Sequence, residues 1–132
     1  MKLLSLLAVT GLLLLMPLAV SGSEHFSVKE YNQFHDVLRP LQHEALPSKD
    51  WGRIRLNAGE LVKRGKAIVK VGVPVGLTKT RGDEFRKEMK KFKSALDKFN
   101  RDAKTGADGD LEASFATLHD SFEMLAGMLP RK

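Results

Sequence analysis

Apolar residues recur at alternating three- and four-residue intervals in four stretches of the chain, and stretches rich in polar residues, glycine or proline separate them. This spacing places the apolar side chains on one face of a helix. No stretch alternates between apolar and polar residues over a useful length, so the pattern does not predict strands. The four predicted helices cover about residues 28–45, 50–71, 83–103 and 111–129.

Four amphipathic helices of about 20 residues, joined mostly by short loops, predict an all-α fold, namely an up-down-up-down four-helix bundle. Pro40 lies inside the first predicted helix. A proline there removes one backbone hydrogen bond, which predicts a kink or a break. The alternative fold is therefore a three-helix core with a loosely docked first helix.

Capping and turn residues mark where the predicted helices begin and end. Ser48 or Asp50 is expected to cap the second helix, and Asp108 or Asp110 the fourth. Gly106 suits the left-handed backbone conformation that often follows the end of a helix.

Gly65 lies on the apolar stripe of the second helix, where it permits a close helix approach or receives a bulky neighbour. The longest connection, about residues 72–82, is predicted to be a loop that forms a crossover or a flap over one end. Phenylalanines at helical spacing are interpreted as ordinary core residues: Phe85, Phe92, Phe99, Phe115 and Phe122.

The first residues have the features of a cleaved signal peptide. Lys2 precedes an apolar run of about 18 residues, and the small residues Ser21 and Gly22 follow it. An uncleaved membrane anchor is the alternative, although Pro17 near the end of the run favours cleavage. We therefore expect a signal peptide at 1–22, a single mature domain at 23–132, and a periplasmic or secreted location.

The 132 residues carry 22 basic and 16 acidic side chains, a net charge of +6. This excess favours anionic partners, but it is spread along the chain, so we interpret it mainly as a contribution to solubility. The chain has no cysteine. Disulfides, thiolate metal sites, a cysteine nucleophile and thioether-linked haem are therefore excluded.

Histidines are the candidate ligands. His35 and His119 lie at the edges of the apolar stripes of the first and fourth helices, whereas His43 is expected to be exposed and His25 lies in the frayed start. The first and fourth helices of such a bundle are antiparallel neighbours. His35 would then lie roughly 10 Å, and His119 roughly 15 Å, from the same end, with His43 roughly 12 Å beyond His35. His119 is thus predicted to share one metal ion with His35, or with His43 as a substitute.

Glu112 and Glu123 are the supplementary ligands that we predict on the flank of the fourth helix that carries His119. Imidazole suits iron, copper, nickel or zinc. The opposite interpretation is that His119 is an ordinary boundary residue, because the chain has no compact ligand motif such as H-E-x-x-H.

The stretch "AKTGADGDLEASFATLHDSFEML" resembles the C-terminal helix of the cytochrome c-prime family. In that family a Gly-Asp loop precedes a helix with C-x-x-C-H, an acid and an aromatic. Here "HDSF" stands in place of the family's histidine, acid and aromatic. The two haem-attaching cysteines would fall at Phe115 and Leu118, which excludes covalent haem.

The resemblance implies a cytochrome-like four-helix bundle and, more weakly, a homodimer. By analogy with bundle cytochromes that hold haem without covalent bonds, it also makes His35 and His119 an axial pair for haem. Two hypotheses follow. The first is an exported binding protein for copper, nickel, zinc or non-covalent haem, and the second is a cofactor-free structural or interaction bundle derived from such a scaffold.

Other classes of function are less favoured. An enzyme is not expected, because the chain lacks a nucleophile elbow and a glycine-rich strand-turn-helix. Nucleic acid is not an expected partner either, since the lysine-rich stretches carry no aromatic residues interleaved for base stacking. Weak contact with an anionic membrane surface remains open.

Overall fold

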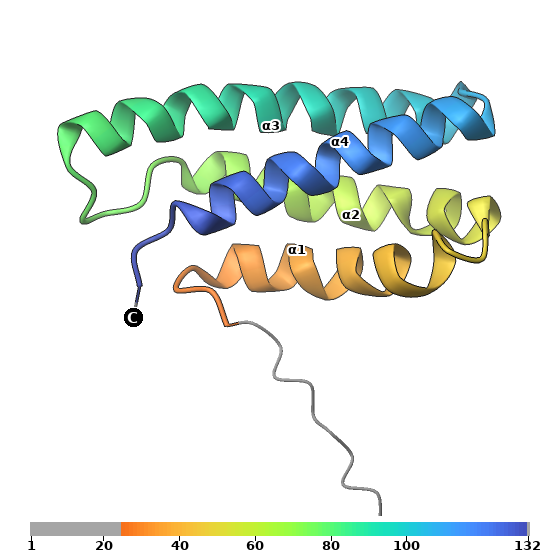
Figure 1. Ribbon diagram of the computed structural model, residues 1–132, viewed down its shortest axis with the longest axis horizontal. Helices are drawn as coiled ribbons and strands as arrows, with labels where there is room; N and C mark the ends of the chain where they lie inside the picture. The colour runs from red at the N-terminus through yellow and green to blue at the C-terminus, as the bar shows by residue number, and fades with distance from the viewer. Residues whose placement is uncertain (1–24, 132) are drawn as a thin grey trace, which may run out of the picture.

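The computed structural model describes residues 25–131, and these form four helices that pack side by side, with no strand within that range (Figure 1). The predicted signal peptide at 1–22 lies outside the described residues. The helical segments are α1 (Lys29–Pro40), a π-helical turn η1 (Leu41–Ala45), α2 (Trp51–Val71), α3 (Lys79–Thr105) and α4 (Asp108–Gly127).

Consecutive helices run in opposite directions, which gives the up-down-up-down order that the spacing predicted (Figure 1). The first helix is not loosely docked. Its side chains Tyr31, Phe34 and Leu38 are fully buried, so α1 belongs to the core and the three-helix alternative is wrong. None of the helices in the described range combines the length and the apolarity needed to cross a membrane.

Pro40 changes the helix rather than breaking it. The backbone remains right-handed helical through Pro40 and Leu41, and the next turn widens into η1. There the Leu46 N–H donates to the Leu41 carbonyl at 2.8 Å, a five-residue interval. Because proline has no N–H to donate, a change of hydrogen-bond register at this point lets the helix continue to Ala45.

Two of the predicted helix starts need correction. Asp50 caps α2 as expected, with its carboxylate accepting from the Arg53 N–H at 3.0 Å. In contrast, α3 begins four residues earlier than Asp83, where Thr78 accepts from the Arg81 N–H at 3.2 Å. Neither Asp108 nor Asp110 caps α4: both lie in its first turn, where carboxylates favour the positive end of the helix dipole.

The prediction of a left-handed Gly106 is wrong, because its φ is −78°. The position still suits glycine for a steric reason. A Cβ built on Gly106 would lie 2.7 Å from the Asp102 Cα and 2.9 Å from the Asp102 carbonyl oxygen, both backbone atoms that cannot move aside.

Gly65 fits the prediction of a bulky neighbour. It is buried, and a Cβ at this position would lie 2.6 Å from Cδ1 of Leu96 on α3. The predicted phenylalanine core is also confirmed, because the five phenylalanines of α3 and α4 are fully buried. The bundle interior is therefore filled by side chains from all four helices.

The basic residues are concentrated in two consecutive helices. Between them α2 and α3 carry 16 basic and six acidic residues, whereas α4 carries five acidic residues and no lysine or arginine. Because α2 and α3 are neighbours, the basic residues lie on one side of the bundle. The expectation of an evenly spread excess therefore needs correction.

Candidate functional site

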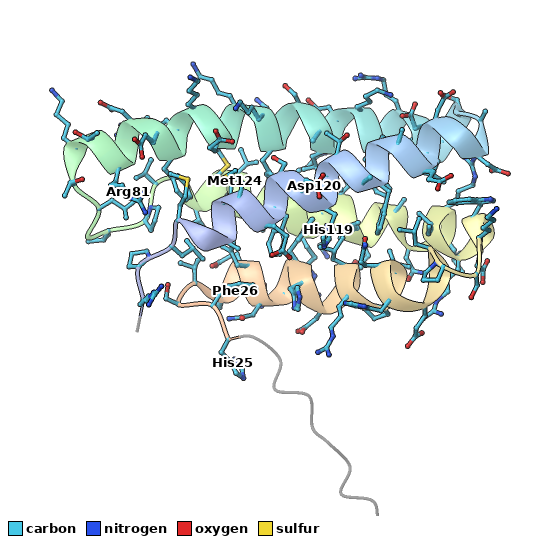
Figure 2. All side chains as sticks on the ribbon, in the orientation of Figure 1. His25, Phe26, Arg81, His119, Asp120 and Met124 are labelled. Atoms are coloured by element: carbon cyan, nitrogen blue, oxygen red, sulfur yellow. The ribbon has the colours of Figure 1, made fainter. Side chains whose placement is uncertain are left out.

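His119 lies on α4 and faces the side of the bundle on which α1 lies (Figure 2). Its side chain is 27% exposed, with Nδ1 3.5 Å from the Asp120 Oδ1 and Nε2 3.7 Å from the Glu123 Oε1. The two carboxylates therefore flank opposite nitrogens of one imidazole. Glu123 comes next to Nε2 because residues four apart lie on the same face of a helix.

His35 occupies a different environment, inside an aromatic cluster. Its ring stacks on Phe122 of α4, with centroids 6.1 Å apart and planes inclined by 20°. The rings of Phe26 and His35 also meet edge to face, with centroids 5.6 Å apart and planes inclined by 87°. The stacking puts His35 at the level of Phe122, which lies one helical turn from His119.

Asn32 holds Phe26 in place over this cluster. The Phe26 N–H donates to the Asn32 Oδ1 at 2.8 Å, and the Asn32 Nδ2 donates back to the Phe26 carbonyl at 2.9 Å. The chain before α1 is thereby folded against the helix. The sequence had suggested a frayed start here, so this ordered contact is a correction.

The remaining predicted ligands lie apart from His119. His43 lies in η1 and is exposed, as expected. Glu112 is also exposed and precedes His119 by two helical turns, roughly 10 Å along α4. Within residues 25–131 no three or more histidine or acidic side chains converge well enough to hold a metal ion together.

Among the described residues, three side-chain polar atoms of α1, η1 and α4 are buried without a hydrogen-bond partner: the Tyr31 hydroxyl, the Gln42 Oε1 and the Ser121 Oγ. Burial of the phenol raises the pKa of Tyr31 above its ordinary value. Helical spacing predicts that Tyr31 shares the stripe of Phe34. It does not predict an unpaired hydroxyl, because pairing depends on neighbours from other helices.

Comparison with known proteins adds no relative: no family model, curated protein or solved structure matches this chain. The resemblance to the cytochrome c-prime family therefore stays a prediction. Function has to be inferred from the chemistry of the side chains alone.

Proposed function

We propose that this protein is an exported helical bundle that binds a transition-metal ion through His119 and Glu123 of α4, with His35 of α1 as an additional imidazole. The single observation that supports this is the arrangement around His119, whose Nε2 lies 3.7 Å from a Glu123 oxygen. An imidazole nitrogen and a carboxylate oxygen are both ligands that zinc accepts, and imidazole also suits copper and nickel.

Asp120 has a separate role in this proposal. Metal-bound histidines usually donate their second ring N–H to a carboxylate, which fixes the tautomer and the ring orientation. Asp120 lies 3.5 Å from Nδ1, on the side of the ring away from Glu123. Protonated Nδ1 would then leave Nε2 as the metal ligand, and Asp120 would act as a positioning residue.

The ligands are expected to contribute unequally. His35 is held between Phe26 and Phe122, so its ring has to leave that stack before it can bind an ion with His119. Non-covalent haem at the same place would require more, namely the displacement of Phe122, whose ring packs 4.7 Å from that of Phe34 and is fully buried. A small ion is thus the favoured ligand.

The test begins with elemental analysis and an absorption spectrum of the natively exported protein. Copper, nickel and zinc are then titrated into the metal-free protein by calorimetry. We expect His119→Ala to abolish saturable binding and Asp120→Asn to weaken it about 10- to 100-fold. His43→Ala is the matched control, because it removes an exposed histidine outside the site. Binding by His119→Ala as tight as that of the parent would overturn the proposal.

A second candidate, the cofactor-free structural or interaction bundle, is favoured by one observation: His35 is already engaged in aromatic packing. If no metal co-purifies and none of the three titrations saturates, this candidate replaces the first. N-terminal sequencing of the exported product tests the location separately, with a start near Ser23 expected.

A further inference from the structure

Large apolar side chains remain exposed mainly at one end of the bundle. Among the described residues, four such side chains are exposed, and three of them, Val71, Val75 and Met124, lie toward the end that holds the α2–α3 loop (Figures 1 and 2). Val75 at the loop tip is 98% exposed, and Val71 in the last turn of α2 is 41% exposed. Exposure of valine at a tip leaves apolar surface available to a partner.

Behind this tip lies a shallow groove of about 330 Å³ whose lining is mainly apolar. It is lined by Val73 and Pro74 of the loop, by Val28 before α1 and by Pro130 after α4. The apolar surface of the tip therefore continues onto the end of the bundle, where both ends of the described chain also lie (Figure 1).

Lysines flank this apolar loop on both sides. Lys70 precedes it in the last turn of α2, and Lys79 follows it as the first residue of α3. Both are exposed, and neither forms an ion pair within residues 25–131. Their charges are therefore not neutralised by a close acidic neighbour.

The acidic residues nearest in sequence are already paired. Asp83 accepts from Arg86 at 2.9 Å, and a Glu84 oxygen lies 3.8 Å from an Arg81 nitrogen. The two free lysines thus leave this end with a positive charge next to exposed valines. Apolar side chains next to cations also hold amphipathic helices at anionic membrane surfaces, through buried apolar area and attraction to the lipid charge.

We propose that the α2–α3 loop docks on the surface of an anionic lipid bilayer. Val75 and Val71 enter the boundary between headgroups and acyl chains, while Lys70 and Lys79 contact lipid phosphates. A protein partner fits less well, because the three exposed apolar side chains at this end supply far less than the roughly 800 Å² per partner of a stable interface. The proposal is independent of the metal site at His119.

Such docking is expected to be reversible and sensitive to salt. A few apolar side chains give only marginal membrane affinity, so electrostatic attraction to anionic lipid has to supply the remaining binding free energy. Each lysine near an anionic surface contributes about a fivefold increase in partitioning, and added salt screens that contribution.

Vesicle co-sedimentation of the chain that starts at Ser23 tests the proposal. This chain retains every buried core residue, since these lie between Tyr31 and Ala126, and circular dichroism checks its fold. We expect binding to vesicles of phosphatidylcholine and phosphatidylglycerol in equal parts, and none to phosphatidylcholine alone. Val75→Ser should abolish most of the binding, and Lys70→Gln and Lys79→Gln should each lower partitioning about fivefold.

Matched controls come from the same chain. Leu56 is 85% exposed in the first half of α2, and Lys49 is exposed in the turn before α2, both away from the α2–α3 loop. Leu56→Ser and Lys49→Gln should leave binding unchanged. Losses equal to those of the loop variants would overturn the proposal, as would equal binding to both vesicle types or binding to neither. A dimer in sedimentation velocity that Val75→Ser dissociates would also overturn it, by assigning the loop to self-association.

Discussion

Arg55 binds the turn between α3 and α4 with both of its terminal nitrogens. One nitrogen donates to the carbonyls of Asp102 and Ala103 at 3.0 and 3.1 Å. The other donates to the Gly106 carbonyl at 2.8 Å and to the Asp108 carboxylate at 2.9 Å. The Asp102 carbonyl also accepts from the Gly106 N–H at 2.9 Å, so Arg55 gives it a second partner. Carbonyls at the end of a helix lack the usual backbone partners further along the chain, and this side chain of α2 binds those of Ala103 and Gly106.

We expect Arg55→Ala to lower the free energy of unfolding by about 2 kcal/mol, because the hydrogen bonds to a charged donor are lost together. Urea denaturation followed by circular dichroism measures this change. Arg53→Ala is the control, since its exposed ion pair with Glu44 should be worth less than about 1 kcal/mol. Equal losses for the two variants would contradict the role assigned to Arg55.

Asp102 makes the stability of the fold depend on pH in the acidic range. The ammonium of Lys98 donates to its carboxylate at 2.8 Å, and this hydrogen bond holds the pKa of Asp102 below its ordinary value. A pKa lowered by folding stabilises the protein above the unfolded value, about pH 4. That contribution is lost as the pH falls through the folded pKa.

Lys98→Gln is therefore expected to destabilise the protein at neutral pH, and its difference from the parent should shrink as the pH falls below about 4. Denaturant unfolding across an acid series measures both. Lys91→Gln, which removes the partner of Glu88, serves as the control for loss of a surface charge. A difference between Lys98→Gln and the parent that does not change with pH would refute this linkage.

Among the elements, α2 and α3 approach each other closely at Gly65, where the side chain of Leu96 occupies the space that a Cβ would fill. Gly65→Ala gains about 1 kcal/mol of helix propensity, but overpacking against a fully buried leucine costs about 1–3 kcal/mol. We expect the cost of overpacking to exceed the gain in helix propensity, because the buried side chain of Leu96 has no room to move aside.

We predict that Gly65→Ala destabilises the bundle by about 1 kcal/mol. In a double-mutant cycle with Leu96→Ala, the alanine at 65 should become neutral or stabilising, because its clash has been removed. Thermal unfolding of the four proteins supplies the cycle. Additive effects would show that the contact between α2 and α3 does not decide the outcome. Gly59→Ala is the control on the same helix, since nothing lies near a Cβ there.

The apolar spacing was sufficient to predict the four helices and their core, since burial of a stripe is what selects a helix face. The apolar spacing did not predict correctly where the helices begin and end. The predicted loop extended to about residue 82, yet Gly82 lies buried in α3, where a Cβ would make an ordinary van der Waals contact with Val73 of the preceding loop at 3.8 Å. In a single sequence, a glycine inside a helix cannot be distinguished from one in the loop before it.

At the scale of the whole molecule, the sequence predicted which side chains near His119 are polar but not how they are oriented. The position of Glu123 four residues away could be predicted from helical geometry. The stacking of His35 on Phe122 could not, because it depends on the angle between α1 and α4 and on the Phe26 contact. The concentration of basic residues in α2 and α3, in contrast, is already visible in the sequence, because 16 of the 22 lie in the continuous stretch 51–105.

The shared location of the two ends of the described chain has a practical consequence for anyone labelling this protein. A fluorescent reporter attached at either end of the described range would lie beside the α2–α3 loop and would obstruct its access to vesicles. The opposite end of the bundle, at the turn that contains Lys49, is the better attachment point. A circular permutant of the described range opened there, with a short linker joining residues 25 and 131, would place its new termini far from the loop.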